Sequence, residues 1–226
     1  MRKTTFSGGE YYHVYNRGVD RREVFCSPKN YDRFLLSMYL LNDRREGNML
    51  SWRDFRKVNP FATLDDFLEN RLRKREPLVE IVAYCLNPNH YHFILRQLEE
   101  RGIEKFMHRL GTSYTKYFNS KNKRSGTLFQ GVFKSTHIDS EEYLLYLSAY
   151  INANNFLHGY NALKKWPHSS LEHYLGKVKD LLVSGEGAIL SRFKSAEEYE
   201  KFIQKNSIFI KEKKELVKYL LEEPVS

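Results

Sequence analysis

The spacing of apolar side chains predicts a strand and then a helix in the first part of the chain. Residues 11–19 are rich in β-forming side chains and predict a strand. Ser27 and Pro28 are typical of a helix start, and Phe34 and Met38 belong to the apolar stripe of the helix that follows.

The same reading predicts a hairpin, a helix, a strand and a further helix downstream. Residues 78–86 and 91–96 are strand-like and are separated by a short Asn-Pro-Asn turn. Apolar residues at helical spacing follow over 102–120, and 128–138 is again strand-like. A last helix in this series is expected over 141–159.

This order of elements predicts the fold class. Strand, helix, strand, strand, helix, strand is the order of a ferredoxin-like split βαβ fold, an α+β arrangement with an antiparallel sheet and helices on one face. Residues 1–176 would form this domain, with an inserted charged segment at about 42–77 that predicts one short helix after Thr63. Residues 177–226 predict a charged, helical C-terminal extension.

Charge and composition indicate the class of partner. The net charge is +9, the estimated pI is about 9.4, and 15% of the 226 residues are aromatic. Positive charge attracts phosphate backbones and aromatic rings stack on unpaired bases, so nucleic acid is the expected partner. The chain has no run of about 18 apolar residues and its two cysteines lack C-x-x-C spacing. We therefore expect a cytoplasmic protein without membrane spans or disulfides.

Two histidines on the second hairpin strand are the strongest local chemical signal. His90 and His92 are two residues apart, so on a strand both imidazoles face the same side and can bind one metal ion. The pair alone is weak evidence, because surface or cross-strand histidines are a more common explanation. Neither cysteine has the spacing to these histidines that a zinc finger needs.

A tyrosine and an asparagine on the last predicted helix form a second signal. Tyr150 and Asn154 are four residues apart, which places them on one helical face. The asparagine carbonyl oxygen is a hard ligand suited to magnesium or manganese, and the phenol can attack phosphorus once deprotonated. A core aromatic and a helix-end asparagine are the plain structural alternatives.

Several sequence blocks, in order, resemble one known family. The blocks are HVYNRGVDRREVF, LNPNHYHFILR, GTLFQGVFKSTHI, EEYLLYLSAYINANN and KKWPHSSLEHYLG. Together they resemble the REP-associated tyrosine transposases, within the superfamily of His-hydrophobe-His (HUH) single-strand transposases and nucleases, over roughly Tyr11 to Gly176. The chain departs from that family at Asn155, where the family often has proline.

The resemblance implies a mechanism and its residues. The histidine pair would bind a divalent metal, Mg²⁺ or Mn²⁺, and a tyrosine 50–60 residues later would be the nucleophile; Tyr150 follows His92 by 58 positions (150 − 92). A polar metal ligand one turn beyond the tyrosine falls on Asn154. The protein would then be a transposase that cleaves and rejoins single-stranded or hairpin DNA of the nucleoid through a 5′-phosphotyrosine intermediate. Tyr143 and Tyr146 are fallback nucleophiles, and a homodimer stays open.

Basic residues near the predicted site are candidate contacts to the DNA backbone. They lie on or after the helix at 102–120 and on the strand that follows: Lys116, Lys121, Lys123, Arg124 and Lys134.

Two other functions compete with this one. A non-catalytic, domesticated protein on the same fold could bind single-stranded or hairpin nucleic acid, but this reading leaves the histidine pair, Tyr150 and Asn154 without a role. A hydrolytic metal nuclease with no covalent step would be separated from the transposase only by trapping the adduct.

Overall fold

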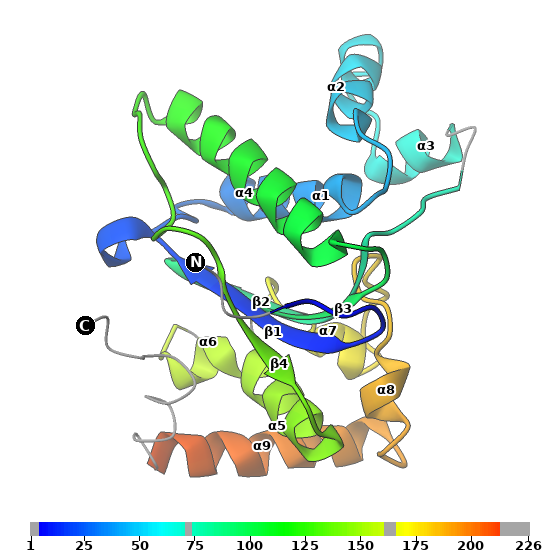
Figure 1. Cartoon of the computed structure of the whole chain (residues 1–226), viewed down its shortest axis with the longest axis vertical. Helices are drawn as coiled ribbons and strands as arrows, with labels where there is room; N and C mark the ends of the chain where they lie inside the picture. The colour runs from blue at the N-terminus through cyan, green and yellow to red at the C-terminus, as the bar shows by residue number, and fades with distance from the viewer. Residues whose placement is uncertain (1–4, 71–73, 161–165, 213–226) are drawn as a thin grey trace.

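Four antiparallel strands form one sheet at the centre of the protein (Figure 1). The structure is a computed structural model that describes residues 5–70, 74–160 and 166–212. The strands, in the spatial order β2-β3-β1-β4, are β1 (Tyr11–Arg17), β2 (Val79–Asn87), β3 (His90–Gln97) and β4 (Lys134–Ile138). The helices are η1 (Val19–Arg21), α1 (Pro28–Leu41), α2 (Asn48–Val58), α3 (Leu64–Glu69), α4 (Gly102–Lys121), α5 (Glu141–Asn152), α6 (Asn154–Leu157), α7 (Leu171–Tyr174), α8 (Gly187–Leu190) and α9 (Ala196–Glu212).

The predicted ferredoxin-like arrangement is confirmed. Helices α1 and α4 join the strands in the expected order and lie together on one face of the sheet (Figure 1). Phe34 of α1 packs against Tyr91 and Phe93 of β3 at ring-centroid distances of 5.5 and 6.4 Å, and against Tyr114 of α4 at 4.9 Å. Alternate residues of each strand point to this face, so one set of side chains builds the core and leaves the other set for the opposite face.

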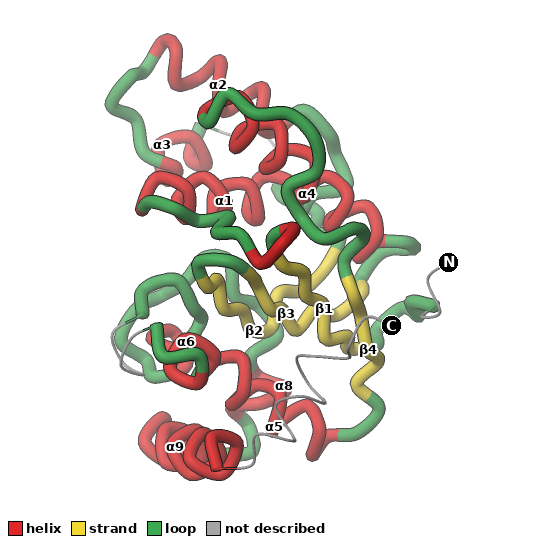
Figure 2. Tube along the Cα trace, turned by 90° about the vertical axis from the view of Figure 1, so that its left-hand side faces the viewer, coloured by secondary structure: helices red, strands yellow, loops and turns green. Residues whose placement is uncertain are grey.

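Further helices cover the opposite face. Figure 2 shows α5, α6 and α9 on the side of the sheet away from α1 and α4. Helix α5 lies next to the sheet and α9 packs on the outside of α5. None of the helices in the described part of the chain has the length and hydropathy needed to span a bilayer. The proposed division into residues 1–176 and 177–226 stays a prediction.

The inserted segment contains two helices, of which one was predicted. Thr63 caps α3 through a capping box: the Asp66 amide donates to Thr63 Oγ1, and the Thr63 amide donates to the Asp66 carboxylate at 2.6 Å. The second helix, α2, was missed, although Met49, Trp52 and Phe55 recur at a spacing of three residues within it. Aromatic side chains pack α2 against α3, since the ring centroids of Trp52 and Phe55 both lie 5.4 Å from the ring centroid of Phe67.

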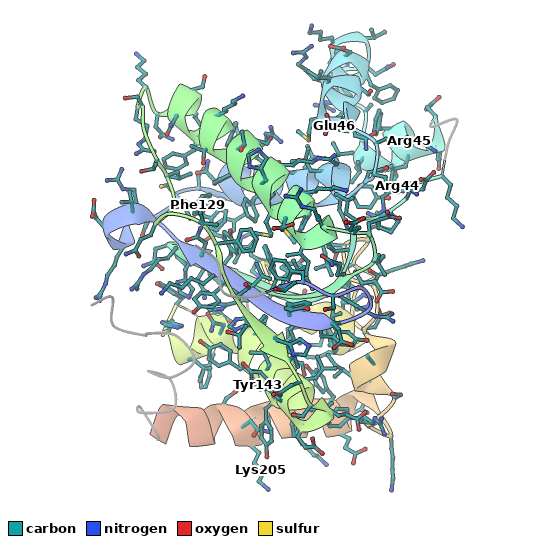
Figure 3. All side chains as sticks on the ribbon, in the orientation of Figure 1. Arg44, Arg45, Glu46, Phe129, Tyr143 and Lys205 are labelled. Atoms are coloured by element: carbon teal, nitrogen blue, oxygen red, sulfur yellow. The ribbon has the colours of Figure 1, made fainter. Side chains whose placement is uncertain are left out.

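Two predicted element boundaries are wrong. The strand predicted over 128–138 begins only at Lys134, because Gly131 adopts a left-handed backbone conformation with φ of 67°. Phe129, labelled in Figure 3, lies in the connection before that strand and is buried. The helix predicted over 141–159 is interrupted at Ala153, where φ and ψ are −101° and 4°, so Tyr150 lies on α5 and Asn154 begins α6.

Candidate metal and nucleophile site

The pairing of β1 with β3 brings the predicted histidines to the face that α5 covers. In this antiparallel register Tyr15 lies opposite His92 and Arg17 lies opposite His90. Paired residues of neighbouring strands share a face, so these four side chains form one group. The rings of Tyr15 and His92 are stacked with centroids 5.5 Å apart.

Hydrogen bonds orient both imidazoles through their δ nitrogens. His90 Nδ1 lies 2.6 Å from Asn89 Oδ1, and His92 Nδ1 lies 2.9 Å from Nε2 of the buried His13. In histidines that bind metals, one ring nitrogen is typically held in this way while the other faces the ion. The arrangement therefore leaves the Nε2 atoms of His90 and His92 as the candidate ligand atoms.

Burial keeps these imidazoles neutral. It lowers the pKa of His90 to about 3, with a smaller contribution from the neighbouring His158, and lowers the pKa of His92 well below its ordinary value. Burial also lowers the pKa of His13 to about 3. A neutral imidazole has the lone pair that a metal ligand needs.

Asn154 joins the histidines from the other side. Its Oδ1 lies 3.1 Å from His90 Nε2. Two ligand atoms on one octahedral ion with bonds of about 2.1 Å lie about 3 Å apart, so this distance fits a shared cation. The Nδ2 group of Asn87 donates to Asn154 Oδ1 and lies 3.0 Å from His90 Nε2, so an amide donor bridges the two acceptor atoms here. The described residues contain no cluster of three His, Cys, Asp or Glu side chains that could hold a metal ion, so the candidate set depends on the asparagine amide.

The rings of Tyr150 and His92 pack in a T-shaped arrangement, with centroids 5.7 Å apart and planes at 82°. Tyr150 is only 1% exposed, and burial raises the pKa of its hydroxyl well above the ordinary value. Both Tyr150 Oη and Asn154 Nδ2 are buried, and neither makes a hydrogen bond of good geometry with the described residues, although the Asn154 side chain lies close enough to the Tyr150 hydroxyl to act against the rise of its pKa. Unsatisfied buried polar atoms are rare in proteins, so two of them next to the histidine pair are typical of a site that takes a ligand.

The fallback tyrosines are less well placed. Tyr146 is 54% exposed and its ring lies 5.7 Å from Phe202 of α9, so it faces away from the histidines. Tyr143 is half-buried near the start of α5. Neither has a ring contact with His90 or His92 in the structure, whereas Tyr150 contacts His92.

A pocket of about 220 Å³ opens beside the histidine pair. Its lining combines cationic, amide and aromatic side chains: Tyr15, Asn16, Arg17, Arg21, Asn89, His90, His92, Gln130, Lys134, His158 and Tyr160. No Asp or Glu belongs to this lining. Three cations without a carboxylate, together with aromatic faces, suit a phosphate with its attached nucleoside.

Lys134 is the predicted DNA contact that lines this pocket. The others lie outside it, on α4 and on the turn that follows. Lys116 and Lys123 are exposed, and Lys121 Nζ lies 3.4 Å from Ser27 Oγ. The Arg124 guanidinium donates to Asn119 Oδ1 and to a backbone carbonyl, which fixes its position at this turn.

Sequence reasoning missed the arginines of the pocket. Arg17 follows the same period of two as Tyr15, so the alternation of β1 could have indicated it once β1 and β3 were paired. Arg21 could not be found in this way, since it depends on the turn η1. There Asp20 and Arg21 have φ of 53° and 58°, a left-handed conformation that costs non-glycine residues about 1 kcal/mol or more each.

Comparison with known proteins finds one matching family and similar solved structures. Residues 64–154 match the family described as transposase IS200 like. A solved structure described as a REP-associated tyrosine transposase bound to a REP hairpin is 16% identical, with a TM-score of 0.49, over 82% of this chain and 91% of that chain. A search of curated proteins finds no significant match.

The segment that matches the family includes the candidate site residues. It runs from α3 to the start of α6, so it contains the histidine pair, Tyr150 and Asn154. Residues 64–154 are similar to the IS200-like transposases, and the predicted resemblance to a transposase family is confirmed for this segment.

Proposed function

We propose that this protein is a DNA transposase that cleaves and rejoins single-stranded or hairpin DNA through a covalent tyrosine–DNA intermediate. One observation carries the proposal. Inside the segment that matches the transposase family, the neutral imidazoles of β3 meet Asn154 and Tyr150, and the buried hydroxyl of Tyr150 lies beside them.

Tyr150 is the proposed nucleophile. Its Oη loses its proton to solvent and forms a bond to the phosphorus of the scissile phosphate, and the bond from phosphorus to the 3′ oxygen breaks as that oxygen takes up a proton from solvent. The products are a 5′-phosphotyrosine and a free 3′-hydroxyl, which later attacks the phosphotyrosine and rejoins a strand. Because Tyr150 is buried and does not line the pocket, the reacting form must expose its hydroxyl to the DNA.

His90, His92 and Asn154 are the proposed ligands of a divalent ion, Mg²⁺ or Mn²⁺. Two imidazole nitrogens and an amide oxygen form a donor set that suits such an ion. Bound there, the ion would polarise the scissile phosphate and favour the phenolate of the nucleophile. His13 and Asn89 would hold the two imidazoles in orientation through their hydrogen bonds.

The pocket is the proposed site of the nucleotide next to the cut. Arg17, Arg21 and Lys134 would neutralise the phosphate, and Tyr160, which is 37% exposed, offers a face to an unpaired base. The basic residues outside the pocket would contact the backbone farther along the DNA: Lys116, Lys121, Lys123 and Arg124.

The test is covalent trapping on a denaturing gel. Labelled single-stranded and hairpin DNA is incubated with the full chain and Mg²⁺ or Mn²⁺, with Tyr150→Phe and Tyr146→Phe in parallel. We expect a protein–DNA band with wild type and Tyr146→Phe, its loss with chelator, and no band with Tyr150→Phe, which still binds DNA. His90→Ala should also lose the band.

Each other outcome points to a different function. A band that persists in Tyr150→Phe and disappears in Tyr146→Phe would move the nucleophile. Cleavage without any adduct would favour a hydrolytic nuclease. Tight binding without cleavage across a broad panel of hairpins would favour the non-catalytic binder, for which the burial of Tyr150 is the supporting observation.

A further inference from the structure

A single phenol connects α9 to the helix that carries Tyr150. Tyr199 of α9 is completely buried. Its hydroxyl accepts a hydrogen bond from Asn152 Nδ2 at 2.9 Å and donates one to Ser148 Oγ at 3.1 Å. Both partners lie on α5 and are themselves fully buried. Helix α9 thus reaches α5 through directional bonds as well as through apolar packing.

The same network continues to the sheet. Ser170 Oγ donates to Asn152 Oδ1 at 2.7 Å and accepts from the backbone amide of Tyr84 on β2 at 2.9 Å. Each side-chain polar group in this chain of bonds has a partner. Buried networks that are fully satisfied fix one arrangement of their members, because any shift leaves a buried donor or acceptor unpaired.

The hydrogen-bond network contacts α5 on the side opposite the candidate nucleophile, Tyr150. Ser148 and Asn152 are two residues before and two residues after Tyr150, and each residue of a helix advances about 100° around its axis. Both are therefore about 200° from Tyr150. Rotation or sliding of α5 would break the bonds of Tyr199, and the same movement would displace Tyr150 from His92.

We propose that Tyr199 is a positioning residue for the transposase site, because it fixes the rotation and axial position of α5. The inference rests on the proposed role of Tyr150. It assigns a function to α9, which lies outside the segment that matches the transposase family. The outward face of α9 has no part in this: Lys205 points away from α5 in Figure 3.

The test compares Tyr199→Phe with Tyr146→Phe in the full chain. Tyr146→Phe is the matched control, since it removes a phenol oxygen from the exposed side of α5. Single-turnover adduct formation at saturating DNA, the Kd for DNA, and amide hydrogen exchange over 141–157 are measured for each. A displacement of about 1 Å can cost about a hundredfold in rate, so we expect Tyr199→Phe to slow adduct formation at least about tenfold.

The expected pattern separates positioning from general destabilisation. In Tyr199→Phe, Kd stays within about twofold, and exchange rises more over 141–157 than in the amides of β1 and β3. Ser148→Ala, which removes one of the two bonds of Tyr199, should give a smaller loss of rate in the same direction. Tyr146→Phe should match wild type in all three measurements.

Three outcomes would overturn the inference. One is a Tyr199→Phe protein with wild-type adduct rate, another is unchanged exchange over 141–157, and the third is a parallel loss of rate, DNA binding and sheet protection. A wild-type protein that forms no adduct would instead remove the proposed function. The exchange measurement would still decide in that case whether Tyr199 holds α5.

Discussion

Replacing Tyr150 by phenylalanine should stabilise the fold while it removes covalent chemistry. The substitution keeps the buried ring against His92 and deletes only the hydroxyl, whose contact with the Asn154 side chain lacks the geometry of a hydrogen bond. A buried polar group without a partner costs about 1–3 kcal/mol, so its removal should raise the free energy of unfolding by about 1–2 kcal/mol. For a chain of this size each kcal/mol raises Tm by about 2–4 °C.

The assay is urea unfolding followed by circular dichroism, with chelator present so that metal binding does not contribute. Tyr199→Phe is the matched comparison, because its hydroxyl is equally buried but makes two hydrogen bonds. That variant should lose about 1–3 kcal/mol, since it leaves the amide of Asn152 without its acceptor. The same chemical change should thus have opposite signs at the two positions. A loss of 1 kcal/mol or more in Tyr150→Phe, at an unchanged m-value, would refute the reasoning.

Three further predictions follow from burial and charge. The pKa values of His13 and His90 are about 3 in the folded protein and 6.5 ordinarily, so below pH 6.5 the unfolded chain binds protons that the folded chain does not. The free energy of unfolding should therefore fall as pH drops from 6.5 toward 3, by up to about 1.4 kcal/mol per pH unit for each imidazole. A free energy of unfolding from urea titrations that does not change between pH 7 and 5 would contradict this. Cys26 is exposed while Cys85 is buried with a pKa raised to about 12, so a thiol reagent should modify Cys26 in the folded protein and Cys85 only after unfolding. Modification of both cysteines in the folded protein would show that β2 is not enclosed. Lys134→Ala should weaken DNA binding by a similar factor for all sequences and reduce the slope of log K against log salt by about 0.7, and an unchanged slope would place this lysine outside the interface.

The sequence predicted those parts of the fold that local patterns determine. The order of the four strands and of α1, α4 and α5 followed from periodicity, and a short helix was expected after Thr63, where α3 begins. The shared face of His90 and His92 followed from the period of a strand, which needs no knowledge of neighbouring chains. These features depend on residues close together in the sequence, so they could be stated before any contact was known.

Other features depend on distant parts of the chain and could not be predicted. Arg21 lines the pocket only because η1 turns after β1, and Tyr199 holds α5 across a separation of 47 residues. The helix is interrupted at Ala153, where neither proline nor glycine indicates an interruption in the sequence. For α2 the apolar spacing of Met49, Trp52 and Phe55 was present in the sequence, but the contacts of Trp52 and Phe55 with Phe67 of α3 were not.

The two sides of α5 differ in a way that bears on how the site works. Toward α9 its polar side chains, Ser148 and Asn152, have partners throughout. Toward the sheet, Tyr150 Oη of α5 and Asn154 Nδ2 at the start of α6 make no hydrogen bond of good geometry with the described residues. The left-handed turn at Arg21 adds strain at the pocket that His90 and His92 line. Polar groups that are unpaired before a ligand arrives need no bond broken when it binds, but they persist only where the surrounding structure is stable enough to hold them. The satisfied side of α5 supplies that support. A substitution of Ser148 or Asn152 should therefore slow adduct formation by displacing Tyr150, whereas a substitution of Tyr150 should remove the nucleophile and with it the adduct.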